Sequence, residues 1–203
     1  MGVFDVVLPN SKVGRVHSIP SVIVVASLAF VGTMFDNYFA FATQLVVTDR
    51  SRYRRVAWGQ ALGVVALMIL AAGVGSLLAP IPLPWIGVLC VAPWALGVQA
   101  WRTRHRPAGE QFRRGAITTF TLTLALGGDN LAVWIPLLRA SGVVHAVVTV
   151  LVFSVWEFLF VVSAQAITGH PRVVKWGSEH AASFIPWIYF GLGVLILFEC
   201  GTL

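Results

Sequence analysis

The sequence predicts an all-α polytopic membrane protein whose six transmembrane helices form two inverted three-helix repeats. The chain has 203 residues, 58% hydrophobic and 11% charged, whereas soluble domains average about a quarter charged. Apolar runs long enough to cross a bilayer, roughly 17 to 25 residues, recur six times. An Asp-Asn pair lies inside the first run and returns inside the fourth.

The charge of the connections between the six runs sets the predicted topology. The first, third and fifth connections contain 11 of the 14 Lys and Arg residues. Basic residues concentrate in cytoplasmic loops, so these three connections are predicted to be cytoplasmic and both termini extracytoplasmic. Lys12 and Arg15, in the outer N-terminal segment, oppose this orientation weakly. The six runs are residues 19–47, 56–79, 85–101, 116–139, 143–167 and 181–199.

Two stretches that occur twice indicate an internal repeat. The Asp-Asn pair lies near the middle of the first and fourth runs, and Pro-Trp-Ile opens the third run at Pro84 and the sixth at Pro186. Each unit has three spans, so the two units cross the membrane in opposite senses, which is a transporter design with its site near the midplane. The predicted organisation is an extracytoplasmic segment (1–18), a first repeat (19–101), a basic cytoplasmic loop (102–115) and a second repeat (116–203).

The paired polar residues, Asp36 with Asn37 and Asp129 with Asn130, are the candidate metal ligands. A carboxylate at the bilayer centre costs at least about 2.5 to 3.5 kcal/mol, so two of them at matched depths need a compensating partner. A cation between the carboxylates would compensate them, with the amide carbonyls as neutral ligands. The alternative is that each pair is structural and hydrogen-bonds across helices.

Other polar residues inside the runs extend the candidate site. Thr33 lies three residues before Asp36, on the same face of a continuous helix, and its hydroxyl is a candidate ligand. Glu157, in the fifth run, is an additional ligand, a proton carrier, or a protonated acid bonded to a neighbour. Gly127 and Gly128 directly precede the second pair, and paired glycines favour local unwinding of the helix.

Several remaining features limit the possible functions. Gln60 is a candidate pathway residue, and Gly59 with Gly63 forms a G-x-x-x-G that indicates close helix packing and permits a homodimer. Cys90 and Cys200 provide no C-x-x-C site and no disulfide framework. No nucleotide-binding G-x-x-x-x-G-K-[ST] is present, so an enzyme that hydrolyses ATP is not expected. The net charge of +6 is explained by the loops that orient the helices and does not indicate nucleic acid.

The order and spacing of several motifs resemble those of a known family. They are "GTMFDN", "GQALG", "PWIGVLCVAPWALGVQA", "LALGGDNLAVWIPLL" and the C-terminal "HPRVVKWGSEHAASFIPWIYFGLGVLILFECGTL". From about residue 25 to 203 the chain resembles the cadmium-resistance (CadD-like) transporters, a branch of the LysE exporter superfamily. The resemblance implies a six-helix exporter of divalent metal ions in the bacterial cytoplasmic membrane, with the two Asp-Asn pairs as ligands. Glu157 departs from the family pattern.

The predicted function is therefore proton-coupled export of a divalent metal ion by alternating access. The resemblance names cadmium, and zinc or manganese are further possibilities. Cadmium is soft, whereas the two pairs offer only oxygen, which suits harder ions. The alternative is an exporter of amino acids or other small metabolites, which the absence of an intramembrane Lys or Arg disfavours. A membrane scaffold is disfavoured by the short loops and the matched acids.

Overall fold

The computed structural model describes residues 18–103 and 116–200, and every element in these two ranges is a helix. A few side chains within the ranges, including that of Asp36, lie outside the description. The predicted N-terminal segment (1–18) and basic loop (102–115) lie almost entirely outside the described residues. Their predicted locations stay predictions.

The first apolar run forms two helices instead of one. Helix α1 (Ile19–Thr33) and helix α2 (Phe35–Val46) meet at Met34, and the two segments are bent by 55°. The second run is α3 (Tyr53–Leu77), preceded by the 3-10 turn η1 (Arg50–Arg52). The third run is divided into α4 (Leu83–Ile86), η2 (Gly87–Cys90) and α5 (Val91–Thr103).

The fourth run is also bent, as the two glycines predict. Helix α6 (Ala116–Leu126) and helix α7 (Gly128–Ala140) meet at Gly127 with a bend of 62°. The two break residues have nearly the same backbone conformation, with φ −93° and ψ 4° at Met34 and φ −82° and ψ 4° at Gly127. The fifth run is the continuous helix α8 (Val143–Ile167), as predicted.

The last helix corrects two predictions made from the sequence. Helix α9 (Pro171–Glu199) begins ten residues before the predicted sixth run, so the fifth connection is mostly helical. Proline is favourable in the first turn, and Lys175 and Glu179, 3.9 Å apart, extend the helix beyond its apolar part. Pro186 consequently lies inside α9, whereas Pro84 lies in the first turn of α4. The Pro-Trp-Ile stretches are therefore not at equivalent positions, while the Asp-Asn pairs are.

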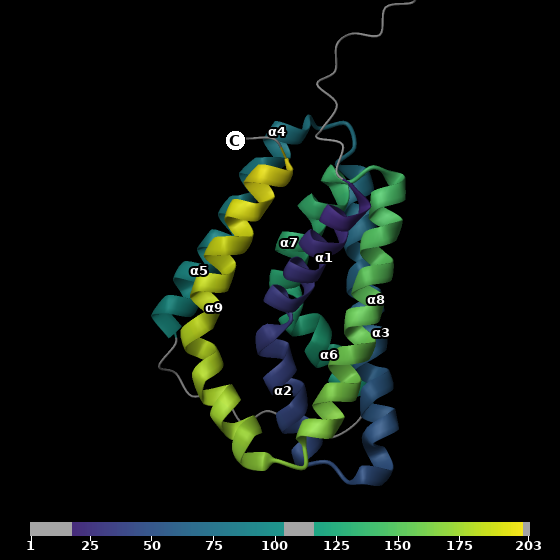
Figure 1. The fold of residues 1–203 in the computed structure, drawn as a ribbon, viewed down its shortest axis with the longest axis vertical. Coiled ribbons are helices and arrows are strands. Elements are labelled where there is room, and N and C mark those ends of the chain that lie inside the picture. The colour runs from purple at the N-terminus through teal and green to yellow at the C-terminus, as the bar shows by residue number, and fades with distance from the viewer. Residues whose placement is uncertain (1–17, 104–115, 201–203) are drawn as a thin grey trace, which may run out of the picture.

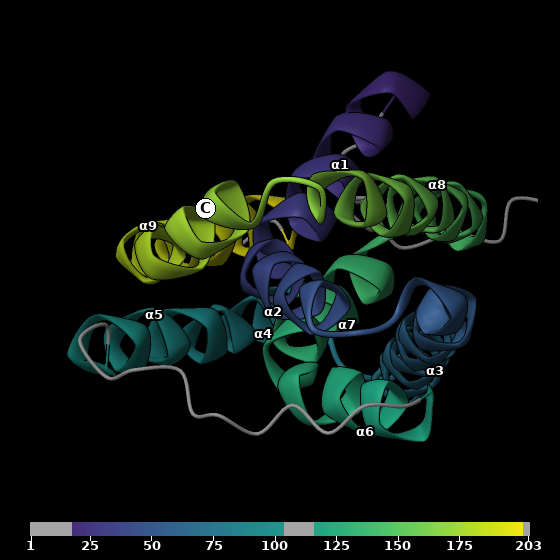
Figure 2. The same cartoon turned by 90° about the horizontal axis from the view of Figure 1, so that it is seen from below.

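Helices α2 and α7 lie in the middle of the molecule, with α3 and α8 on one side and α5 and α9 on the other (Figures 1 and 2). Helix α3 packs against α6 and α7, and helix α8 packs against α1 and α2. Helices α5 and α9 run side by side along one flank. Each long helix of one half therefore packs against the bent helices of the other half.

The lengths and apolar surfaces of the helices fit a membrane protein. The segments Arg50–Leu77 and Val143–Ile167 are each long and apolar enough to cross a bilayer. If each bent pair counts as one span, the described residues contain up to four spans, and the apolar parts of α5 and α9 are shorter. Large apolar side chains such as Ile69 and Phe158 are about two thirds exposed, at 66% and 67%, as expected where lipid covers the surface.

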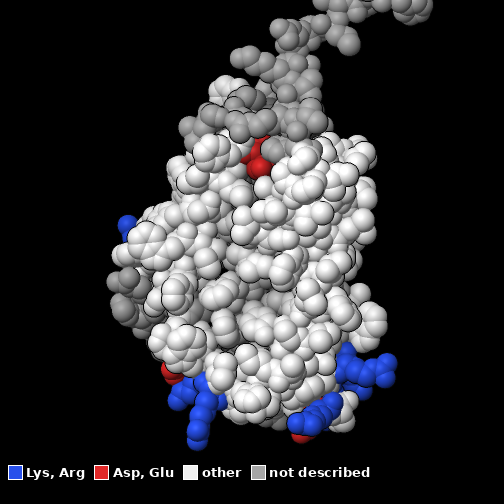
Figure 3. All heavy atoms as spheres, in the orientation of Figure 1, with Lys and Arg blue, Asp and Glu red and all other residues white. Residues whose placement is uncertain are grey.

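The charged side chains are concentrated at one end of the molecule (Figure 3). Most of the visible Lys and Arg side chains lie at the lower end, where Figure 1 places the α2–α3 and α8–α9 junctions. The basic residues of these two junctions are Arg50, Arg52, Arg54, Arg55, Arg172 and Lys175. Between this end and the opposite one, the visible surface is nearly free of charge.

The break at Gly127 requires a residue without a side chain. A Cβ at Gly127 would lie 2.4 Å from Leu67 Cδ1 and 2.9 Å from the Thr123 carbonyl oxygen, whereas a Cβ at Gly128 would have no atom within 4 Å. We expect Gly127→Ala to lower the free energy of unfolding by about 1–3 kcal/mol, as overpacked sites do. Gly128→Ala is the matched control and should melt like the wild type in detergent. Equal melting temperatures for the two variants would contradict the packing argument.

Candidate metal site at the two helix breaks

The two Asp-Asn pairs occupy the same position relative to the two breaks. Asp36 and Asn37 are the second and third residues of α2, and Asp129 and Asn130 are the second and third residues of α7. The first turn of a helix has backbone N–H groups without helical partners and a partial positive charge. Each acid therefore belongs to a first helical turn, where the helix itself favours a negative charge.

The two pairs meet at the sulfur of Met34. The Asn130 side-chain amide donates to Met34 Sδ at 3.3 Å, and the Asn37 amide donates to the same sulfur at 3.7 Å. All three side chains are buried. The structure therefore brings together one predicted ligand from each half of the chain. Met34 was not predicted as part of the site, because an apolar residue in an apolar run carries no signal of its own.

The carboxylate of Asp129 has a hydrogen-bond donor on each oxygen. The Asn130 backbone N–H donates to Oδ1 at 2.8 Å, and the Tyr189 hydroxyl of α9 donates to Oδ2. Hydrogen bonds to an ionised group are stronger than bonds between neutral groups. Tyr189 is a further residue of the candidate site that was not predicted from the sequence, although a tyrosine in an apolar run is a weak indication of a buried hydroxyl partner.

The side chain of Asp36 lies outside the description, and only its place in the first turn of α2 is given. That the two carboxylates face each other stays a prediction. Among the described residues, no group of three or more His, Cys, Asp and Glu side chains is arranged to hold a metal ion. A metal at the breaks would therefore need neutral ligands as well as carboxylates.

Thr33 was predicted as a ligand on the assumption that it and Asp36 belong to one continuous helix. The break at Met34 separates them. Thr33 is the last residue of α1, so it does not share a helical face with the first pair. Its hydroxyl donates to the Ala29 carbonyl at 2.9 Å and accepts from Trp134 Nε1 at 3.1 Å. The bond from Trp134 joins α7 to α1 beside the breaks, and the two bonds together leave the oxygen one lone pair for an ion.

Glu157 lies in a different place from the two pairs. It borders a groove of about 380 Å³ between α3 and α8, whose other polar side chains are Arg54, Ser154 and Gln165. The side chain is 6% exposed, and neither carboxylate oxygen has a hydrogen-bond partner among the described residues. The Ser154 hydroxyl, a candidate neighbour, donates to the Val150 carbonyl at 2.8 Å.

Buried polar residues continue from the first pair along α2, α3 and α6. The Gln44 amide donates to Thr119 Oγ1 at 2.8 Å, and Gln60 Oε1 lies 2.7 Å from Thr123 Oγ1. Together with Asn37 these residues border a cavity of about 10 Å³, about the volume one water needs. The predicted pathway residue Gln60 is thus part of a polar tract, and Gln44, Thr119 and Thr123 were missed.

The glycines next to Gln60 pack within the chain. A Cβ at Gly63 would lie 2.7 Å from Thr123 Cβ, so α3 and α6 are in close contact there. Gly59 is also buried. The predicted close helix packing is confirmed for Gly63, and the G-x-x-x-G is not an exposed surface for a second copy. The G-x-x-x-G therefore does not support the predicted homodimer, which stays a prediction.

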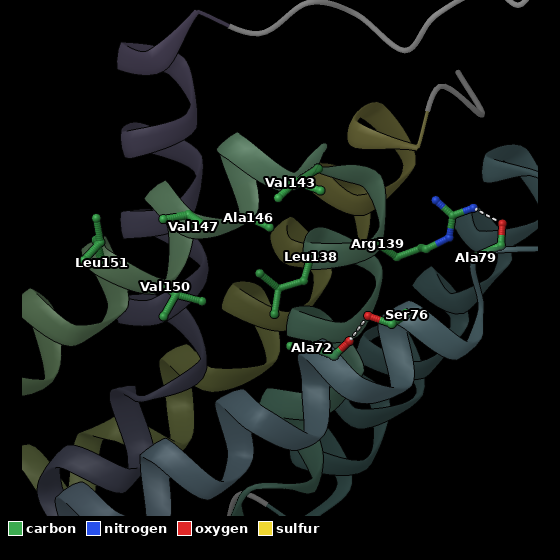
Figure 4. A pocket seen from close by; sticks show the side chains of 12 residues that line it. Ala72, Ser76, Ala79, Leu138, Arg139, Val143, Ala146, Val147, Val150 and Leu151 are labelled. Carbon is green, nitrogen blue, oxygen red and sulfur yellow. Dashed lines mark hydrogen bonds between the residues drawn. The ribbon is translucent and has the colours of Figure 1, made fainter.

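Arg139 borders a wide groove at the C-terminal end of α3 (Figure 4). The groove has a volume of about 580 Å³ and lies among α3, α7 and α8. The Arg139 guanidinium donates to the carbonyls of Leu78 at 3.0 Å, Ala79 at 2.7 Å and Ile81 at 3.1 Å. The cation therefore stabilises the end of α3 and is directed away from the groove that it borders.

The two cysteines are buried and not paired with each other. Cys90 is in η2, and Cys200 follows the last residue of α9, eleven residues after Tyr189. At 1.5 Å per helical residue this places Cys200 about 16 Å along α9 from the tyrosine that contacts Asp129. The thiol of Cys200 is therefore not a ligand beside the Asp129-Asn130 pair.

Bent apolar spans with buried acids and amides at their breaks are typical of secondary transporters, and this is the class that the fold and the site indicate. The family model of cadmium resistance transporters matches residues 30–203. The chain belongs to this family and is a membrane protein of the transporter class. Searches of curated proteins and of solved structures found no significant match.

Proposed function

We propose that the protein exports a divalent metal ion, with cadmium as the leading candidate, across the bacterial cytoplasmic membrane. The single observation that carries the site is the convergence of Asn37 and Asn130, from separate bent spans, on Met34. The acid next to each asparagine supplies the charge that a divalent cation would neutralise. Membership of the cadmium resistance transporter family supports the ion class.

The hydrogen-bond donors around Asp129 partly offset the cost of burying an ionised carboxylate. Asp129 lies in the first turn of α7 and accepts from Tyr189 and from the Asn130 backbone. A bound cation would compete with the Tyr189 hydroxyl for Oδ2, and Tyr189 would return when the ion leaves. The Asp129 carboxylate would then have a partner both with the ion bound and after its release. This lowers the cost of release, as a transport site requires.

Alternating access would use two inverted halves, α1 to α5 and α6 to α9. The long helices α3 and α8 both have 25 residues, and each packs against the bent span of the other half. A pseudo-twofold axis in the membrane plane would produce this exchange of partners. In the proposed cycle the halves rock around the breaks and expose the ion first to the cytoplasm and then to the outside.

The basic end of the molecule is proposed to face the cytoplasm, because short cytoplasmic loops are enriched in Lys and Arg. This places the α2–α3 and α8–α9 junctions inside and both termini outside. The sequence contains no Walker-type nucleotide motif. A proton gradient is therefore the proposed energy source, with outside protons displacing the metal.

The acids at the breaks are the first target for a test. We expect Asp36→Ala and Asp129→Ala each to abolish cadmium tolerance in a sensitive host, because each removes half of the charge that holds a divalent ion. The amount of protein in the membrane is measured in parallel. Glu179→Ala, which removes an exposed acid of α9, is the matched control and should retain tolerance. Full tolerance in both aspartate variants would disprove the proposed site.

Efflux from loaded vesicles distinguishes the metal exporter from the amino-acid exporter. Cadmium, zinc, manganese and calcium are compared with and without a pH gradient, and basic and neutral amino acids are added as competitors. No intramembrane Lys or Arg is available to pair with a substrate carboxylate among the described residues, since Arg139 is bonded to carbonyls of the α3–α4 connection. Competition by amino acids would favour the alternative.

We infer that Glu157 carries the coupling proton and is not a ligand of the metal. A metal ligand needs partner ligands, and the groove offers Glu157 only the Ser154 hydroxyl, the Gln165 amide and the cationic Arg54. A proton needs only one acceptor. Of the helices packed against α8, α1 has no titratable side chain. The described titratable groups on the others are Tyr38 of α2, Tyr53, Arg54 and Arg55 of α3, Asp129 and Arg139 of α7, and Arg172, Lys175, Glu179, His180, Tyr189 and Glu199 of α9. Of these groups, Arg54 borders the groove of Glu157.

Replacement of the acid by its amide tests this role. We expect Glu157→Gln to bind cadmium as the wild type does, because the breaks are unchanged, but to lose the stimulation of transport by a pH gradient. Binding is measured by calorimetry on purified protein, and transport is measured in inverted vesicles. Ser154→Ala, a neighbour in the same groove, is the control. Loss of cadmium binding in Glu157→Gln would assign Glu157 to the metal site.

We propose that the polar tract is the cytoplasmic route to the breaks. The Thr123 hydroxyl has one proton and lies 2.9 Å from the Thr119 carbonyl as well as 2.7 Å from Gln60 Oε1. A half-turn of the Gln60 amide lets its NH₂ donate to Thr123, as the Gln44 amide donates to Thr119. Both amide oxygens are then available to a passing cation, and neutral ligands bind weakly enough for the ion to move on.

Apolar replacements of the two glutamines test the route. We expect Gln44→Leu and Gln60→Leu to lower the initial rate of cadmium transport several-fold, while equilibrium binding at the breaks is unchanged. Rates are measured in inverted vesicles and binding on purified protein. Gln99→Leu, on an exposed position of α5, is the control. Unchanged rates in both buried-glutamine variants would place the route elsewhere.

A further inference from the structure

We propose that Met34 is a soft ligand of the transported ion and gives the site a preference for cadmium over harder divalent cations. The inference rests on the proposed function and names the ion class that the same site prefers. The paired aspartates and asparagines alone offer oxygen, which suits manganese, calcium and magnesium. A thioether is a soft, polarizable donor, so one sulfur among these oxygens changes the preference of the whole site.

The position of Met34 is that of a ligand shared by both halves. It is the break residue between α1 and α2, it is 1% exposed, and its sulfur accepts from Asn37 and from Asn130. Asn130 belongs to the first turn of α7, three residues after the other break at Gly127. An ion bound at this sulfur would therefore contact both bent spans at the point where they meet.

The amide of Asn130 supplies an independent indication of a ligand. Its side chain is completely buried, and Asn130 Oδ1 has no hydrogen-bond partner among the described residues. A half-turn of the amide exchanges its oxygen and nitrogen and brings the unpaired oxygen toward the sulfur. A cation bound between Sδ and Oδ1 would satisfy an acceptor that the protein itself does not satisfy. The neighbouring Asp129 carboxylate would add the negative charge.

Other sulfur atoms of the described chain are in different places. Cys200 is about three helical turns along α9 from Tyr189, Cys90 is in η2, and Met68 borders the groove of Glu157. An apolar packing role for Met34 is the competing explanation, since Met34 also contacts the hydrophobic core. The two explanations differ in one respect: packing requires the volume of the side chain, and a ligand requires its sulfur.

The test replaces sulfur at nearly constant volume. Met34→Leu is compared with the wild type in inverted vesicles for cadmium and for manganese uptake, with Met68→Leu as the matched control and Met34→Cys as a variant that keeps a soft donor. We expect Met34→Leu to lower cadmium transport about tenfold or more, in line with the 10- to 100-fold effects of changes around metal sites. Manganese transport should change little, and Met34→Cys and Met68→Leu should retain the cadmium preference.

The outcomes separate this inference from the proposed function. If the wild type transports cadmium and Met34→Leu keeps the same cadmium-to-manganese ratio, Met34 is a packing residue and the inference is wrong. If Met34→Leu is folded and loses both ions equally, the sulfur does not set the preference, and the inference is again wrong. If the wild type transports no divalent ion, the proposed function fails, and the inference fails with it.

A spectroscopic measurement covers the case in which Met34→Leu does not fold. Cadmium is bound to a Cys90→Ser, Cys200→Ser double variant, and its X-ray absorption spectrum is analysed for a sulfur neighbour. We expect sulfur scattering, because both thiols are absent and Met34 is the sulfur at the breaks. A coordination shell of oxygen and nitrogen only would overturn the assignment of Met34 as a ligand.

Discussion

The structure depends on the interruption of two apolar helices at the points where they carry acids. A continuous helix would place each carboxylate beside peptide groups that are already paired, whereas a break supplies the unpaired N–H groups of a new first turn. Asp129 has this environment, with a further donor from Tyr189. The packing around the break follows from it, because α3 approaches Gly127 so closely that Leu67 leaves no room for a Cβ.

The two breaks also explain how the proposed metal site could combine hard oxygen ligands with a soft sulfur ligand. Met34 is in the first break, where its sulfur meets an amide from each bent span. In the proposed site the carboxylates would supply charge, the amides neutral oxygen, and the thioether a polarizable donor that the cysteines cannot supply from their positions. The contrast between a cadmium family and an oxygen-rich motif is resolved if the family's ion is held by this mixed set.

The polar residues outside the breaks divide into two separate groups. Gln44, Gln60 and the α6 threonines form a narrow tract that adjoins Asn37. Glu157 lies instead in a groove between α3 and α8 and has no hydrogen-bond partner among the described residues. A metal and a proton would thus bind at different places in one bundle. Coupling would then depend on movement of α3 and α8, the two helices that border both the groove and the bent spans.

The sequence by itself determined the membrane class, the glycine break of the fourth run and the two Asp-Asn pairs, because apolar length, charge and helix-breaking residues are local properties. It did not determine the break at Met34, because the single Gly32 two residues earlier is a weaker signal than the paired glycines of the fourth run. It also did not determine the start of α9 at Pro171, where the helix begins ten residues before the apolar run. Only the tertiary structure decided that Asn37 and Asn130 converge on one sulfur and that Tyr189 contacts Asp129. These contacts depend on the bends of 55° and 62° and on the packing of helices far apart in the chain, which no local pattern specifies.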